Sequence, residues 1–374
     1  MKTDETLGAA LARRGISRRA FVKLGAMMSS LLALGPGSAS ALAAGLQAAK
    51  RRSVIWLSFQ ECTGCTESLT RSHSPTLEDL IFDFISLDYH HTLQAVSGAA
   101  AEEARAQAMR DNAGEYLVIV DGSIPMADGG IYSTIAGITN AQMLEETVAN
   151  AFAVVAVGTC ATFGGLPMAH PNPTGAVSVD TLVTNKPVIN ISGCPPIPTV
   201  MTGVLAHILA FGSLPALDHL KRPKAFFGES IHDRCYRRAF YEQGLFAESF
   251  DDEGARKGYC LYKVGCKGPV THNACATQKW NGQTSFPIES GHGCFGCSEP
   301  NFWDQPGGIY QPLPAGKLPD MPDVALAALV GGGLGVAGGA MARMRQNRND
   351  AATKARAEQA AESVGPAQGK GDER

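Results

Sequence analysis

The feature that most constrains this chain is a set of cysteines placed where predicted strands end. Between about residues 53 and 220, apolar runs alternate with helix-like stretches, a pattern typical of a parallel α/β sheet. Strands are predicted at 53–59, 116–120, 152–157 and 188–191, and three of them run into cysteine-bearing turns. Because the carboxyl ends of parallel strands border the binding crevice of such a sheet, we expect these thiols to meet there. They belong to Cys62, Cys65, Cys160 and Cys194.

Four converging thiols suit an iron–sulfur cluster. The spacing of Cys62 and Cys65 allows two thiolates to bind one metal centre from the start of a helix, where free backbone N–H groups favour an anionic cluster. Glycines beside the thiols, at 64, 158 and 193, permit close backbone approach and hydrogen bonds to sulfur. Thioredoxin-like redox pairs share the first spacing, but the two further cysteines favour a 4Fe–4S cluster over zinc or two disulfides.

From Lys221 onward the hydrophobic periodicity fades and the cysteines become dense. One group consists of His232, Cys235, Cys260 and Cys266, and a second of Cys275, Cys294 and Cys297. One histidine and three cysteines can hold zinc, and six cysteines of an exported protein can form three disulfides. The second group has only three thiols, which is the number that a cuboidal cluster lacking one iron requires. Iron–sulfur chemistry is therefore favoured, with zinc and disulfides as the alternatives.

Both ends of the chain resemble targeting segments. Residues 1–43 predict a twin-arginine signal peptide, with a basic region around Arg18 and Arg19, a weakly apolar stretch and a small-residue site at 41–43. This route exports folded proteins that acquire cofactors in the reducing cytoplasm, which counts against disulfides.

Residues 324–342 contain nineteen residues without a charge, enough to cross a bilayer core at about 1.5 Å per residue. The arginines that follow predict that the polar tail, residues 343–374, lies in the cytoplasm. The folded part of the chain would then lie on the outer side of the membrane. Six glycines make this segment a poor hydrophobic span, so a flexible Ala/Gly linker is the alternative.

Charge and length exclude other classes of protein. The chain has 32 basic and 35 acidic side chains, which argues against a nucleic-acid partner bound by neutralising phosphates. Its 374 residues predict two domains with enough core to fold without disulfides.

These motifs resemble those of the small subunit of membrane-bound nickel–iron hydrogenases. The matching segments are 61–67 (ECTGCTE), 158–161 (GTCA), 193–196 (GCPP), 232–235 (HDRC) and 291–304 (GHGCFGCSEPNFWD). The resemblance covers roughly residues 50–312 and accounts for all ten cysteines. It implies an α/β fold: a flavodoxin-like parallel-sheet domain at 44–220, an irregular cysteine-rich iron–sulfur domain at 221–315, and a C-terminal membrane-anchor helix at 324–342.

The resemblance also implies two 4Fe–4S clusters and one 3Fe–4S cluster. The proximal 4Fe–4S cluster would be bound by Cys62, Cys65, Cys160 and Cys194, the distal 4Fe–4S cluster by His232, Cys235, Cys260 and Cys266, and the medial 3Fe–4S cluster by Cys275, Cys294 and Cys297. Where some relatives carry a further medial ligand, this chain has Pro287, which cannot bind iron. Gly64 and Gly165 stand where oxygen-tolerant members have extra cysteines, which implies an ordinary proximal cluster.

The function implied by the resemblance is electron transfer, with no catalytic residue on this chain. A separate large subunit would carry the nickel–iron centre, and the heterodimer would interconvert H2 with two protons and two electrons. Electrons would pass through the clusters to a membrane acceptor, such as a cytochrome b, at the periplasmic face of the cell membrane. The alternatives are an iron–sulfur subunit of another respiratory oxidoreductase, such as a quinone reductase, and an exported structural protein stabilised by zinc or disulfides.

Polar residues near the motifs carry weaker predictions. Arg234, Arg237 and Arg238 predict either a basic face that steers an acidic redox partner or an ordinary solvated face. Glu61 is a candidate for proton movement or for stabilising the start of a helix. His90 has no ligand-like spacing and is interpreted as an ordinary polar residue.

Overall fold

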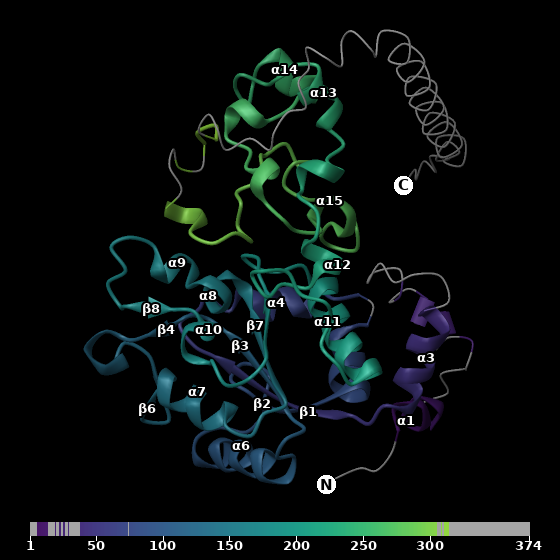
Figure 1. Cartoon of the computed structure of the whole chain (residues 1–374), viewed down its shortest axis with the longest axis vertical. Helices are drawn as coiled ribbons and strands as arrows, with labels where there is room; N and C mark the ends of the chain where they lie inside the picture. Colours follow the sequence, from purple (N-terminus) through teal and green to yellow (C-terminus); the bar gives the residue numbers. More distant parts are fainter. Residues whose placement is uncertain are drawn as a thin grey trace, which may run out of the picture. The chain divides into compact units, whose positions relative to one another are not determined.

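A parallel sheet of five strands lies at the centre of the fold (Figure 1). The computed structural model describes residues 6–13, 38–73, 75–304, 308 and 310–313, with positions 19, 22, 23, 25, 26 and 29. The strands are β1 (Arg52–Ser58), β2 (Ile85–His90), β3 (Leu117–Asp121), β7 (Ala153–Val157) and β9 (Val188–Ile191). Their order is β2-β1-β3-β7-β9 with every pair parallel, which is the 2-1-3-4-5 order of flavodoxin-like sheets.

The four predicted strands are confirmed, each with ends within one residue of the expected ones. The fifth strand, β2, is not predicted by the sequence pattern. It lies at the edge of the sheet beside β1 and mixes apolar and polar side chains, three of which are only partly buried. The inner strands β3 and β7 are buried at every position, and such continuous apolar runs are what central parallel strands show.

Helices cover both faces of the sheet, because side chains along a strand point alternately to opposite faces. Val54 and Trp56 of β1 belong to a core that includes α3 (Ser38–Ala48) and α11 (Pro198–Phe211). Ile55 and Leu57 belong to a second core, which includes α6 (Ala99–Asp111) and α7 (Asn140–Val148). The remaining helices and strands of this half are α1 (Leu7–Arg13), α4 (Gly64–Thr70), α5 (Leu77–Asp79), η1 (Leu80–Phe84), β4 (Ile124–Pro125), η2 (Ala127–Gly130), β5 (Thr134–Ile135), β6 (Ile138–Thr139), α8 (Gly158–Phe163), α9 (Gly165–Met168), β8 (Ala176–Val177) and α10 (Val179–Leu182).

The cysteine-rich segment after residue 220 consists of short helices and turns. In its described residues the longest helix has five residues. Phe226, Ile231 and Leu261 join the same core as α11, so packing against the sheet half compensates for the lack of regular structure. Its elements are α12 (Lys224–Phe227), η3 (His232–Arg234), α13 (Arg238–Glu242), α14 (Glu253–Arg256), η4 (Tyr262–Val264), η5 (Gly268–Val270), α15 (Cys275–Gln278) and η6 (Phe302–Asp304).

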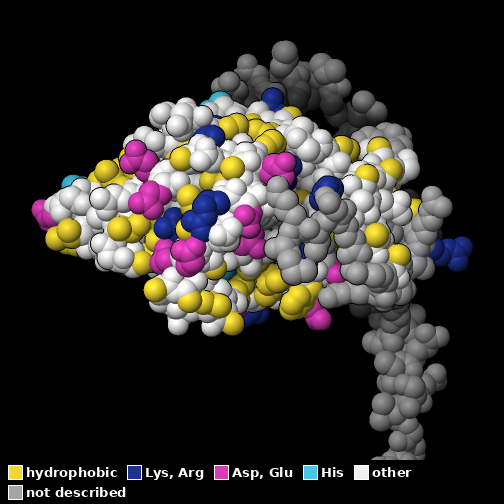
Figure 2. Space-filling model, turned by 90° about the horizontal axis from the view of Figure 1, so that it is seen from below, with side chains coloured by type: hydrophobic (Ala, Val, Ile, Leu, Met, Phe, Trp, Pro, Cys, Tyr) yellow, Lys and Arg dark blue, Asp and Glu magenta, His cyan; other side chains and the backbone are white. Residues whose placement is uncertain are grey.

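Charges of both signs are intermixed on the face that carries α6. Figure 2 shows Lys and Arg side chains beside Asp and Glu side chains on the face seen from below Figure 1. On α6, Arg110 and Glu103 form an exposed ion pair with an N–O distance of 2.6 Å. This mixture agrees with the near-neutral charge of the whole chain.

The predicted targeting segments are only partly described. α1 and α3 pack against each other, and α3 packs against α11, where Leu42 and Leu46 are fully buried. No helix among the described residues is long and apolar enough to cross a membrane. The predicted span at 324–342 and the tail at 343–374 lie outside the described residues.

Candidate metal centres

The four strand-end cysteines come together at the carboxyl edge of the sheet. Cys62 and Cys65 lie at the start of α4 after β1, Cys160 lies in α8 after β7, and Cys194 follows β9. Burial is the main cause that raises the pKa of the Cys65 thiol, and the charges of Asp121 and of the other three thiols act in the same direction. The four thiols are thus electrostatic neighbours. Cys62 and Cys194 are exposed on this chain, so the site lies at its surface.

Backbone shape brings these loops close to one another. Gly158 has φ of +87°, and a Cβ placed there would lie only 2.4 Å from the Sγ of Cys65. A side chain at this position would therefore collide with a candidate ligand, and only glycine adopts this conformation without strain.

Buried ionisable groups lie behind the proximal thiols. Asp121, at the end of β3, is fully buried, and burial raises its pKa to about 6. The hydroxyl of Thr66 donates a hydrogen bond to Asp121 (Oγ1–Oδ2 3.4 Å). Burial and then the charge of Asp121 raise the pKa of Glu61 to about 7.

His90 also belongs to this buried group, which corrects its interpretation as an ordinary polar residue. Its side chain is fully buried, with its ring centroid 5.0 Å from that of Trp56. Burial, followed by the charge of His91, lowers the pKa of His90 to about 4. The imidazole is therefore neutral at pH 7.

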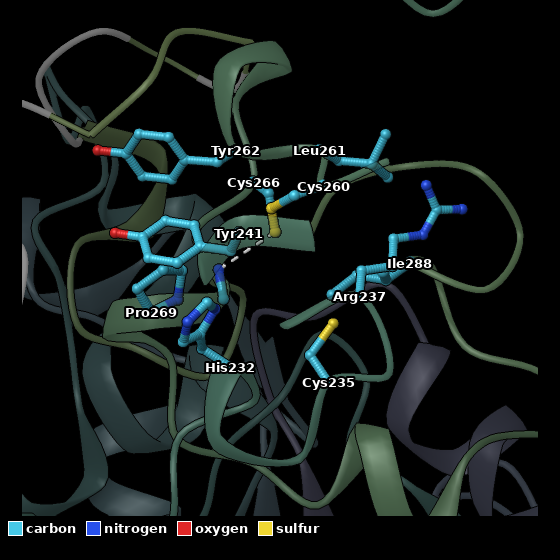
Figure 3. Close-up of a pocket in the computed structure, with 11 residues that line it drawn as sticks. His232, Cys235, Arg237, Tyr241, Cys260, Leu261, Tyr262, Cys266, Pro269 and Ile288 are labelled. Carbon is cyan, nitrogen blue, oxygen red and sulfur yellow. Dashed lines mark hydrogen bonds between the residues drawn. The ribbon is translucent and has the colours of Figure 1, made fainter. Parts of the chain in front are cut away.

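The second predicted group lines one cavity in the cysteine-rich segment (Figure 3). In Figure 3 the sulfur atoms of Cys235 and Cys266 point toward the space between them. Two tyrosines lie on one side of the cavity, and the ring of Tyr241 meets that of His232 edge-on at 4.6 Å. The lining includes His232, Cys235, Cys260 and Cys266.

The arginines beside this cavity do not form the predicted basic face. Arg237 is buried, and its guanidinium donates to the carbonyl of Tyr259 (2.8 Å). Arg234 and Arg238 are exposed, but each pairs with a nearby carboxylate, at 2.6 Å and 2.9 Å respectively. The prediction of a basic surface that steers a redox partner is therefore wrong for Arg237. The charges of Arg234 and Arg238 are balanced by neighbouring carboxylates.

The third group, Cys275, Cys294 and Cys297, is the most enclosed. Burial is the main cause that raises the pKa of Cys294, and the charges of Cys266, Cys297 and Cys275 act in the same direction. The N–H of Gly296 donates to the Sγ of Cys294 at 3.4 Å, an interaction that stabilises a metal-bound thiolate. Pro287 is half-buried and offers no donor to metal.

The three groups of candidate ligands are adjacent to one another. The N–H of Cys294 donates to the Sγ of Cys266 at 3.3 Å, which links the third group to the second. Burial raises the pKa of Cys297 and the backbone N–H of Cys194 acts in the opposite direction, so the first group lies beside the third. The group of Cys275, Cys294 and Cys297 therefore lies between the other two.

The chemistry of the thiols fits iron–sulfur clusters better than the alternatives. All ten cysteines are free, which contradicts the disulfide alternative. Among the described residues, no three His, Cys, Asp or Glu side chains lie close enough to share one metal ion. A zinc ion holds its sulfur ligands at about 2.3 Å, whereas a cuboidal cluster binds each ligand at a different corner and so needs ligands that are farther apart.

These features define an α/β protein whose thiols gather in three adjacent groups, and comparisons with known proteins identify its family. Residues 227–310 match the C-terminal family of the NiFe/NiFeSe hydrogenase small subunit, and residues 62–208 match the family of the NADH ubiquinone oxidoreductase 20 Kd subunit. The uptake hydrogenase small subunit of Azotobacter vinelandii is 45% identical over 90% of this chain and 94% of its own length. The uptake hydrogenase small subunit of Rhizobium leguminosarum bv. viciae is 47% identical over 84% of this chain and 87% of its own length.

A solved structure shows the same likeness. The [NiFeSe]-hydrogenase of Dm. baculatum has a chain that aligns with a TM-score of 0.66 and 34% identity over 71% of this chain and all of its own. The chain belongs to the nickel–iron hydrogenase small-subunit family, as its motifs indicated. It is the electron-transfer subunit of a hydrogenase, pairs with a large subunit and binds iron–sulfur clusters. The quinone-reductase alternative shares only the sheet half.

Proposed function

We propose that this chain relays the electrons of an uptake hydrogenase through three clusters in the order proximal, medial, distal. The observations that carry this order are two hydrogen bonds, one from the hydroxyl of Thr159, directly before Cys160, to the carbonyl of Cys297, and one from the N–H of Cys294 to the Sγ of Cys266. The first joins the proximal group to the medial group, and the second joins the medial group to the distal group. Electrons enter at the proximal group, whose Cys62 and Cys194 are exposed, and this edge of the sheet is where the large subunit binds.

The cluster types follow from the donors in each group. Four thiols at the sheet edge bind a 4Fe–4S cluster. Three thiols, two of them buried and that of Cys297 partly buried, bind a 3Fe–4S cluster, with Pro287 in place of a fourth donor. In the distal group, the neutral imidazole of His232 replaces one thiolate of a 4Fe–4S cluster, and such a replacement raises the reduction potential. The last centre of the relay is thereby made a better electron acceptor.

Export and anchoring complete the proposal. Residues 1–43 direct the folded, cofactor-loaded chain through the twin-arginine route, and residues 324–342 hold it at the periplasmic face of the cell membrane. The polar tail, residues 343–374, lies in the cytoplasm. At the membrane, a protein such as a cytochrome b accepts electrons from the distal cluster. The arginine pair, the uncharged run and its flanking charges support this part.

Metal analysis of the intact complex with the large subunit tests the proposal. We expect about eleven irons per small subunit, with nickel assigned to the partner, and an electron paramagnetic resonance signal of an oxidised 3Fe centre. Much less iron in an intact and active complex would contradict the three-cluster relay. Two clusters with no 3Fe signal would contradict the medial assignment alone.

A further inference from the structure

Thr159 joins loops that carry ligands of two different clusters. It is the second residue of α8, directly before Cys160, and its side chain is almost completely buried. Its hydroxyl accepts a hydrogen bond from the N–H of Gly193 (3.0 Å) and donates one to the carbonyl of Cys297. Its own N–H donates to the carbonyl of Gly193 at 2.8 Å. One side chain thus touches the turn before Cys194 and the medial ligand Cys297.

The same two loops bring the N–H of Cys194 close to the thiol of Cys297. Gly193 immediately precedes Cys194, and the N–H of Cys194 acts against the burial that raises the pKa of Cys297. The hydroxyl of Thr159 holds both ends of this contact, the turn on one side and the backbone of Cys297 on the other. The position of the Cys194 N–H relative to the Cys297 sulfur therefore depends on Thr159.

We propose that Thr159 is a positioning residue of the relay, which holds Cys297 against the proximal loop and thereby sets the reduction potential of the medial cluster and the rate at which it receives electrons. The inference rests on the proposed function, since it assumes that Cys194 and Cys297 bind different clusters. Thr159 itself touches neither iron nor substrate.

Loss of the hydroxyl has a definite consequence for the medial cluster. Valine has nearly the shape of threonine but leaves the N–H of Gly193 and the carbonyl of Cys297 buried without their partner, a strongly unfavourable arrangement. The loops separate to find water, and the N–H of Cys194 moves away from the Cys297 sulfur. An N–H group directed at a cluster sulfur favours the reduced state, so its displacement lowers the medial potential.

The rest of the medial loop has separate support, so the substitution leaves the fold in place. Arg222 donates to the carbonyl of Ser298 (3.3 Å) and to Glu299 (3.0 Å), directly after Cys297. The hydroxyl of Ser298 donates to the carbonyl of His272 at 3.0 Å. These contacts remain when Thr159 loses its hydroxyl.

The experiment compares three variants of the complete complex. Thr159→Val removes the hydroxyl and Thr159→Ser keeps it. Thr162→Val is the matched control, because Thr162 is equally buried on α8 and its hydroxyl donates only within the helix, to the carbonyl of Thr159 at 3.5 Å. Redox titration followed by electron paramagnetic resonance gives the medial potential, and rapid freezing after exposure to H2 gives the rate of medial reduction.

We expect Thr159→Val to keep all three cluster signals, to lower the medial potential by about 59 mV, a tenfold change in a one-electron equilibrium, and to slow medial reduction. Thr159→Ser and Thr162→Val should match the unaltered complex.

If Thr159→Val loses only the medial signal while Thr159→Ser keeps it, the inference is also supported. An unchanged medial potential in Thr159→Val, or equal shifts in the serine or control variants, would overturn it. Absence of clusters from the unaltered complex would instead refute the proposed function, and this inference with it.

Discussion

Replacement of Arg222 by methionine tests how the medial loop is held against the sheet half. Arg222 is 1% exposed, although it carries a positive charge. Its guanidinium pairs with Asp218 (Nε–Oδ2 2.8 Å) and with Glu299 (Nη1–Oε1 3.0 Å), both largely buried. Glu299 also accepts a hydrogen bond from the N–H of His272 at 2.6 Å. One arginine therefore neutralises two carboxylates that solvent reaches only poorly.

Removal of the arginine leaves those carboxylates buried without a cation. The loss of one partner from a buried ion pair costs about 3–5 kcal/mol. At about 2–4 °C per kcal/mol for a unit of 150–250 residues, we expect Arg222→Met to lower the midpoint of thermal unfolding by about 6–20 °C. Because Glu299 lies two residues after Cys297, the medial 3Fe signal should be lost before the proximal signal on heating.

The matched control is Arg110→Met, which breaks the exposed pair with Glu103 on α6. Exposed pairs contribute about 0.2–1 kcal/mol, so the midpoint should fall by less than about 4 °C. Addition of Asp218→Asn and Glu299→Gln to Arg222→Met should restore part of the loss, since the buried charges are then absent. Equal destabilisation by Arg222→Met and Arg110→Met, measured by circular dichroism of the purified complex, would refute this reasoning.

Three further substitutions address single sites. Gly158→Ala places a Cβ only 2.4 Å from the Cys65 sulfur, in a backbone with φ of +87°. We expect loss of the proximal cluster with the medial and distal signals kept, and a full iron content would contradict this. Pro287→Cys supplies a fourth medial thiol and should convert the 3Fe signal toward that of a four-iron cluster. An unchanged 3Fe signal would show that the loop containing residue 287 does not face the medial cluster. His90 has its pKa lowered to about 4 by burial, against about 6.5 in an unfolded chain. Between these values the unfolded chain binds more protons, so stability falls as the pH drops from about 6.5 to 4. His90→Gln should flatten this part of the stability profile, and a profile as steep as that of the unaltered complex would show that other groups cause it.

The cysteine positions relative to the sheet could be predicted because they depend on local periodicity and one topological rule. Runs of four to six mainly apolar residues identify β3, β7 and β9 without knowledge of their neighbours. Once the strands are parallel, their carboxyl ends must share an edge. The grouping of Cys62, Cys65, Cys160 and Cys194 follows from that rule, and the structure brings them together there.

Other features depend on distant contacts and had no local signal. β2 is an edge strand whose mixed side chains resemble a loop, and it is identified by pairing with β1. His90 and Arg237 are polar residues that the fold buries against Trp56 and Tyr259, so their surroundings could not be inferred from their neighbours along the chain.

The amino-acid sequence by itself determined the parallel α/β fold and the family, and it predicts the residues that bind metal. Only the tertiary structure decided how the three groups of donors follow one another. The contacts that join them connect residues such as Thr159 and Cys297, which are 138 positions apart. Such contacts exist because irregular loops pack on a shared core, and no periodic pattern of side chains specifies which loop meets which.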